Sequence, residues 1–138
     1  MLQSLLARIS PGRPPPEAWF TRTDAALGGA GVSLRYLGTA GFVLEAEGRT
    51  IALDPYLSRH DLGALFGGPL RPNLEMLARH VPQVDDVFVG HAHYDHALDA
   101  PDVCRRTGAR LIGSRAVCMV GRAAGLPESQ LVETSGHE

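Results

Sequence analysis

Apolar and polar residues alternate in short stretches from Val32 onward, and such alternation is typical of half-buried strands. The stretches are separated by glycine-containing turns, one over Gly38–Gly41 and one at Gly48. Strands that recur about every ten residues and are joined by such turns predict an antiparallel meander. The three predicted strands cover residues 32–36, 42–46 and 50–54.

From residue 85 onward, strand-like apolar segments alternate with segments that have helical character. Strand–helix–strand connections of this kind call for parallel pairing with right-handed crossovers. A meander followed by such crossovers predicts a mixed α/β fold. The predicted strands are residues 85–90, 109–113 and 130–133, and the predicted helices run from Asp99 or Asp102 to about Arg106 and from 114 to 124.

The segment between these two halves has little regular patterning. Residues 57–72 are rich in glycine and proline, and we expect an irregular loop that is long enough to be functional. Asn73 is expected to cap a short helix that continues through Arg79.

The beginning of the chain has its own composition. Prolines at positions 11, 14, 15 and 16 exclude a regular helix or a central strand there. We therefore divide the chain into a Pro/Gly-rich arm over residues 1–31 and one domain over residues 32–138. Trp19 and Phe20 are the residues expected to fix the arm to the domain.

The composition excludes several function classes. All 13 basic residues are arginines, so a Schiff-base lysine and a P-loop lysine are excluded. The net charge of −2 disfavours a nucleic-acid partner, and no apolar stretch is long enough for membrane insertion. Cys104 and Cys118 form no CxxC pair and are expected to be buried thiols, which fits a cytoplasmic protein without a signal peptide.

The most informative segment follows the predicted strand 85–90 and reads His91-Ala-His-Tyr-Asp-His96. Residues two apart in an extended segment project to the same side, so His91 and His93 can converge on one ion. A turn after Tyr94 would direct Asp95 and His96 to a second position nearby. Imidazole nitrogens with one carboxylate suit Zn²⁺, with iron or manganese as poorer alternatives.

This segment resembles the HxHxDH signature of the metallo-β-lactamase superfamily. The Gly38–Gly41 turn, the Leu53-Asp54-Pro55 strand end and the strand before His91 follow that family's order. The Asp-Pro pair and the Asp99 that follows most resemble two branches, the ascorbate-phosphate lactonase-like hydrolases and the phospholipase-D-like hydrolases of N-acyl phosphatidylethanolamines. The resemblance implies the first half of an αββα sandwich.

The resemblance also implies site residues and a reaction. His91 and His93 would bind a first metal, Asp95 and His96 a second, and Asp54 would support the ligand loop from behind. The implied protein is a hydrolase in which a zinc-activated hydroxide attacks an ester, a lactone or a phosphodiester of a small molecule. Asp95 and His96 are therefore expected to be catalytic as well as metal-binding.

The family completes its site with further His and Asp ligands from later strands, and only His137 lies downstream here. We therefore expect a missing C-terminal half or a companion chain to supply them. The alternative is a non-catalytic half-domain that binds metal or a partner chain. An ordinary structural role stays open for Asp54 and Tyr94, and is favoured for His60, His80 and His137 and for the arginines at 105, 106, 110, 115 and 122, which could otherwise bind phosphate.

Overall fold

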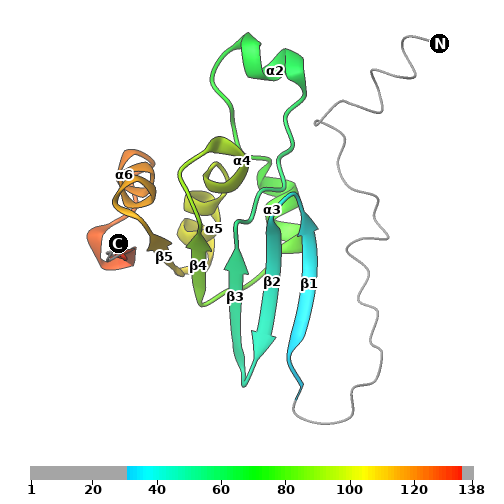
Figure 1. The fold of residues 1–138 in the computed structure, drawn as a ribbon, viewed down its shortest axis with the longest axis vertical. Helices are drawn as coiled ribbons and strands as arrows, with labels where there is room; N and C mark the ends of the chain where they lie inside the picture. The colour runs from blue at the N-terminus through cyan, green and yellow to red at the C-terminus, as the bar shows by residue number, and fades with distance from the viewer. Residues whose placement is uncertain (1–30, 135–138) are drawn as a thin grey trace, which may run out of the picture.

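Six strands form one mixed sheet, and their order across the sheet is their order along the chain (Figure 1). The computed structural model describes residues 31–134, apart from the side chains of residues 62 and 65. The first three strands pair antiparallel and the last four pair parallel, which confirms the predicted mixed α/β fold. The strands are β1 (Ser33–Gly38), β2 (Gly41–Ala46), β3 (Arg49–Leu53), β4 (Asp86–Val89), β5 (Arg110–Gly113) and β6 (Leu131–Glu133).

Helices connect the parallel strands, and two of the longer ones begin at capping side chains. Asn73 accepts a hydrogen bond from the Met76 N–H at the start of α3, and Ser114 accepts one from Val117 at the start of α6. Gly108 ends α5 in a left-handed conformation, which costs glycine little. The helices are α2 (Leu62–Gly67), α3 (Leu74–His80), α4 (Tyr94–Ala97), α5 (Ala100–Thr107) and α6 (Arg115–Ala123), followed by the short 3-10 helix η2 (Glu128–Gln130).

Two of these helices correct the predictions. Residues 57–72 are not wholly irregular, because α2 lies within them, with Asp61 capping the N–H of Ala64. The expected turn after Tyr94 is one turn of helix, α4. Both helices are too short for a periodic apolar pattern, so the sequence did not reveal them.

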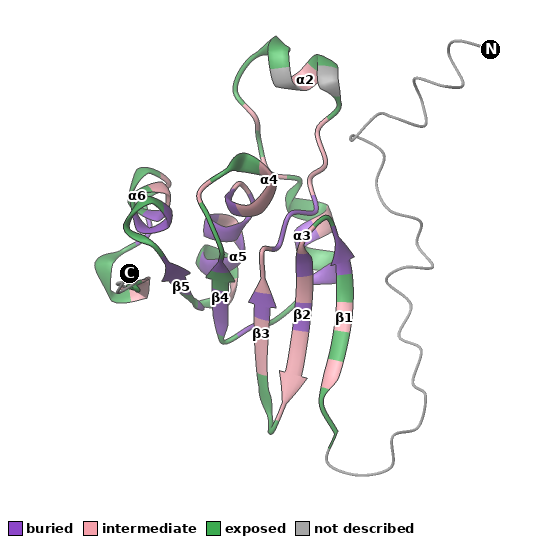
Figure 2. Ribbon diagram, viewed as in Figure 1, coloured by how far each residue is buried: buried purple, intermediate pink, exposed green. Residues whose placement is uncertain are grey.

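One face of the sheet is packed against helices and forms the core. A row of paired residues crosses this face from β2 to β6, and Leu77, Val103 and Val117 of helices α3, α5 and α6 belong to the same core cluster. The buried segments of these strands and helices are coloured in Figure 2. Burial of these side chains provides most of the driving force for folding. The row consists of Val43, Ala52, Val87, Leu111 and Leu131.

The opposite face of the sheet also carries a row of apolar residues. Among the described residues, the helices that build the core cluster do not pack on this face. Phe88 is 38% exposed and Tyr36 is 39% exposed, although both lie within the sheet. An apolar sheet face of this kind usually meets a second layer of structure. The row, in register across all six strands, consists of Tyr36, Phe42, Leu53, Phe88, Ile112 and Val132.

Most of the arginines considered as a phosphate-binding group have structural partners. Arg106 donates to backbone carbonyls at the end of α3, including the Pro82 oxygen at 2.8 Å. Arg110 pairs with the buried Asp86, and Arg122 pairs with Glu128. The hydrogen bond from Arg110, more than any other contact, lowers the pKa of Asp86.

The remaining predictions concern the cysteines, membrane-spanning helices and residues near the two ends of the chain. Cys104 and Cys118 are buried thiols, and burial raises the pKa of Cys104 to about 12. Over residues 31–134, the longest helices fall well short of the length and hydrophobicity needed to cross a bilayer. The arm, with Trp19 and Phe20, and His137 lie outside the described residues.

Candidate metal centre

The candidate site lies at the edge of the sheet where β3 and β4 end. These strands are parallel neighbours, with Leu53 paired to Phe88, so their carboxyl ends meet. The residues that follow are therefore brought together, Asp54 after β3 and Gly90 and His91 after β4. Ligand sites in open α/β sheets commonly occupy this position.

Asp54 is held firmly at this edge. Its N–H donates to the Phe88 carbonyl at 2.9 Å, and its Oδ1 accepts a hydrogen bond from the Gly90 N–H at 2.7 Å. Its backbone is left-handed, with φ at +40°, a conformation that costs a non-glycine residue energy. A Cβ atom at position 41 would lie only 2.8 Å from the Asp54 carbonyl oxygen. Because Gly41 has no Cβ atom, the neighbouring turn leaves room for the Asp54 backbone.

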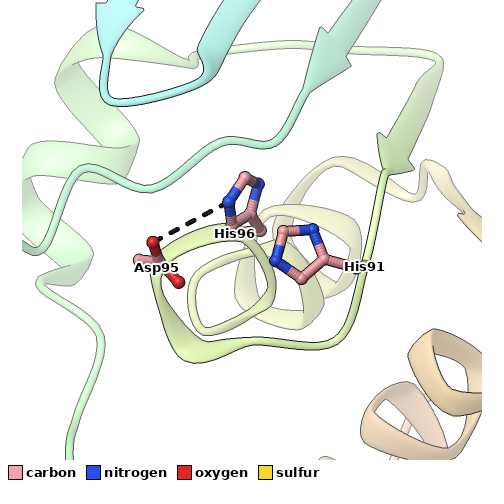
Figure 3. Close-up of side chains that lie close together, drawn as sticks. All are labelled: His91, Asp95 and His96. Carbon is pink, nitrogen blue, oxygen red and sulfur yellow. Dashed lines mark ion pairs between the residues drawn. The ribbon is translucent and has the colours of Figure 1, made fainter.

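Three potential ligands converge in the segment after β4 (Figure 3). His91, Asp95 and His96 each offer one ligand atom, and these atoms lie within 4.8 Å of one another. The α4 turn brings them together, because the N–H of His96 donates to the His93 carbonyl and folds the segment back. The imidazole rings of His91 and His96 have centroids only 3.9 Å apart.

His93 stands apart from this group. It precedes α4, its side chain is exposed, and its ring lies edge-on to that of His91 with centroids 4.6 Å apart. The structure therefore brings together His91, Asp95 and His96, and it leaves His93 beside them. The division of these four residues between two ions, as expected from the sequence, stays a prediction.

The His96 ring lies between two carboxylates. Its Nδ1 is 3.0 Å from Asp54 Oδ2, and its Nε2 is 3.8 Å from Asp95 Oδ2. The Nδ1 atom is thus close enough to Asp54 for an ion pair, but the two groups are not aligned for a hydrogen bond. Among the described residues, Nδ1 has no hydrogen-bond partner. A small rotation of the ring would let Nδ1–H donate to Asp54, as metal-binding imidazoles usually donate to a carboxylate behind them.

The comparisons with known proteins agree with this geometry. Residues 37–131 match the model of the metallo-beta-lactamase superfamily, and this match spans most of the chain. The chain belongs to the metallo-β-lactamase superfamily. Its ligand segment and Asp54 both lie within the matched residues.

Relatives within the superfamily are named metal-dependent hydrolases. The chain is 29% identical to a UPF0173 metal-dependent hydrolase of Methanopyrus kandleri over 75% of its own length, and 38% identical to one of Anaeromyxobacter dehalogenans over 69%. It is structurally similar to Igni18, a metallo hydrolase of Ignicoccus hospitalis, with 28% identity and a TM-score of 0.54 over 78% of this chain. The chain spans 40%, 31% and 41% of these proteins, respectively.

A surface hollow of about 630 Å³ lies next to the candidate metal centre. Phe42, Leu53, Phe88 and Ile112 line it from the uncovered sheet face, and Asp54 lies at its margin. The hollow is thus continuous with the apolar row described above, so a second layer of structure on this face would form its other wall.

Asp99 has a role that the sequence did not predict. It directly precedes α5, where a helix was expected to start, yet its side chain makes no capping bond. Instead it accepts hydrogen bonds from the N–H groups of Leu57 and Ser58, at 2.6 and 2.8 Å, and from the Ser58 hydroxyl at 2.5 Å. The carboxyl is fully buried, and burial raises its pKa. Asp99 therefore ties the loop after β3 to the start of α5.

Tyr94, His60 and His80 lie outside the ligand group. Tyr94 is 42% exposed and lies edge-on to the buried Tyr56, whose hydroxyl accepts from the His60 N–H. His80 is buried at the end of α3, where its carbonyl accepts a hydrogen bond from Arg35. Tyr56 thus contacts both Tyr94 and the loop at His60, whereas the His80 carbonyl is bonded to β1.

Proposed function

We propose that the chain provides the metal-binding part of a metal-dependent hydrolase, in which a zinc-activated hydroxide attacks an ester, lactone or phosphodiester of a small molecule. The observation that carries this proposal is the group of two imidazoles and one carboxylate, within 4.8 Å, at the carboxyl ends of β3 and β4. Membership of the superfamily and the names of the relatives support it.

The donor set fits a zinc ion. Neutral imidazole and carboxylate are ordinary zinc ligands, and three protein ligands with one open position are typical of catalytic rather than structural sites. His91, Asp95 and His96 would hold the ion. Bound zinc supplies Lewis acidity and makes water a nucleophile near neutral pH.

The chain's own residues prepare this site. A proton on His96 Nδ1, facing Asp54, leaves the Nε2 lone pair for the metal, so Asp54 selects the ligating tautomer. An Asp95 oxygen left free by the metal would orient a water and accept its proton. This gives Asp95 and His96 the catalytic roles expected from the sequence.

Further ligands are proposed to come from His93 and from residues outside this chain. The relatives are more than twice as long as the aligned segment. A companion chain or a C-terminal half would provide both the additional ligands and a cover for the apolar sheet face.

Zinc titration of the full chain tests the proposed centre. Replacing His91 or His96 with alanine is expected to weaken zinc binding at least about 100-fold, because each change removes a direct ligand. His60→Ala is the control, since His60 lies in a neighbouring loop outside the ligand group. Zinc binding that is unchanged in both ligand variants would reject this location.

The alternative, a half-domain that binds metal or a partner without turnover, is supported by the exposed apolar face. Hydrolysis of a panel of lactones and phosphodiesters distinguishes the two. Zinc-loaded chain that stays inactive after its companion is added favours the alternative. Activity that appears with the companion and disappears in His96→Ala favours the hydrolase.

A further inference from the structure

Arg59 differs from the paired arginines of this protein. It follows β3 in the loop above the site, and its Nη2 has one distant contact, with the Leu37 carbonyl at 3.4 Å. Its Nε is buried without a hydrogen-bond partner, and within residues 31–134 no carboxylate lies at ion-pair distance from it. Arg110 and Arg122, by contrast, each pair with a carboxylate.

The local structure is strained and shaped around this side chain. The backbone of Arg59 is left-handed, with φ at +42°. A Cβ atom on Gly38 would lie 1.6 Å from Nη2, so the guanidinium occupies space that a glycine at this turn leaves open. Burial lowers the pKa of Arg59, because desolvation disfavours the charged form.

Arg59 lies on the same edge of the sheet as the metal centre. Gly38 ends β1 and pairs with Gly41, which in turn lies against Asp54 at the end of β3. The Gly38–Gly41 turn thus lies between the guanidinium and Asp54. This position suits a group of the substrate that is remote from a scissile bond at the metal.

We propose that Arg59 binds an oxyanion of the substrate, a phosphate or carboxylate group remote from the bond that is hydrolysed. A guanidinium presents planar N–H pairs that match either group, and a partly desolvated one binds an anion more strongly than an exposed one. The inference rests on the proposed function, because it assigns Arg59 to the substrate of that same centre. Arg59 is thus a specificity residue, and it would select anionic over neutral substrates.

Oxyanion binding to the full chain tests this directly. The chain is treated with EDTA, so that phosphate has no metal to bind, and is titrated calorimetrically with inorganic phosphate and, separately, with acetate at constant ionic strength. Arg59→Gln is expected to weaken binding of the preferred oxyanion about tenfold or more, because it removes a charge-assisted contact. Arg59→Lys should restore part of the affinity. Arg71→Gln removes the same charge from an exposed position between α2 and α3 and should bind like the wild type.

Wild-type affinity in Arg59→Gln would overturn the inference, and so would wild-type chain that binds neither oxyanion. Zinc titration of the same variants separates this outcome from failure of the proposed function. Arg59→Gln is expected to bind zinc with unchanged affinity. If the wild-type chain does not bind zinc, the metal centre itself is rejected.

Discussion

At the scale of single residues, Asp54 contributes to the site through both its backbone and its side chain. The left-handed backbone turns the carboxylate toward β4, where one oxygen meets the Gly90 N–H and the other meets His96. A residue that keeps such strain is usually fixed by its surroundings for a functional reason. The sequence indicated Asp54 by its place at the end of a predicted strand, before a proline, and by the resemblance to the superfamily.

Replacing Asp54 with asparagine tests its proposed effect on His96. The amide can still accept from Gly90, but it no longer favours a proton on His96 Nδ1. We expect zinc affinity to fall about 10- to 100-fold, as is usual when a carboxylate behind a ligand is lost. Competition with a chromophoric chelator measures the change. Asp102→Asn, at an exposed pair with Arg105, is the control and should leave zinc affinity unaltered.

Asp99 acts on stability rather than on the metal. Replacing it with alanine leaves the N–H groups of Leu57 and Ser58 without their acceptor, and we expect a loss of about 2–4 kcal/mol in the free energy of unfolding. Asp99→Asn keeps one acceptor and should lose less. Urea denaturation measures both variants, and equal stabilities for the two would contradict this view of the loop.

Asp99 also predicts a pH dependence. Its folded pKa is raised above the ordinary value of 3.8, so the folded state holds the proton more tightly than the unfolded state. The corresponding stability is fully present below pH 3.8 and is lost as the pH rises through the folded pKa. Asp99→Asn cannot titrate, so the stability difference between wild type and this variant should change across that range. A difference that stays constant with pH would show that Asp99 does not titrate there.

At the scale of elements, close packing where β5 meets α6 depends on glycine. A Cβ on Gly113 would lie 2.8 Å from the Val89 carbonyl oxygen and from Val117 Cγ1. A Cβ on Gly121 would approach only the ends of leucine side chains, which can move. The Val89 carbonyl that Gly113 approaches belongs to the backbone at the end of β4, which cannot move as easily as the end of a side chain.

Alanine substitutions at these glycines should therefore differ in effect. Gly113→Ala is expected to lower the unfolding free energy by about 1–3 kcal/mol through overpacking, and Gly121→Ala by less. Gly67→Ala is the control, because nothing lies within 4 Å of the added methyl group. Thermal or urea denaturation ranks the three, and a neutral Gly113→Ala would show that β5 can shift away from β4.

The elements also show how far sequence reasoning reached. Turn glycines and apolar alternation located all six strands to within about two residues, and polar caps located α3 and α6. The sequence did not predict α4, because four residues are too few to show a helical period of apolar positions. It therefore could not indicate which of the candidate ligands converge. The roles of Asp99 and Arg59 depend on contacts more than 20 residues apart, which no local pattern encodes.

At the scale of the whole molecule, the uncovered apolar face governs how the chain behaves alone. We expect the full chain to self-associate as its concentration rises, because an apolar row crosses the sheet without a described covering layer. Phe88→Ser should reduce this association in sedimentation velocity. Phe66→Ser, which removes a phenyl ring that is 90% exposed on α2 rather than on the sheet, should not. A chain that stays monomeric at all concentrations would contradict the expectation.

The sequential order of the strands has a consequence for biosynthesis. Each strand pairs with one that left the ribosome earlier, so the sheet can lengthen at a single edge during translation, and no strand has to insert between two others. Asp54 is already in position when the segment after β4 emerges, and the nascent Gly90 can bond to it at once. The candidate metal centre can thus form before α5 and α6 have left the ribosome.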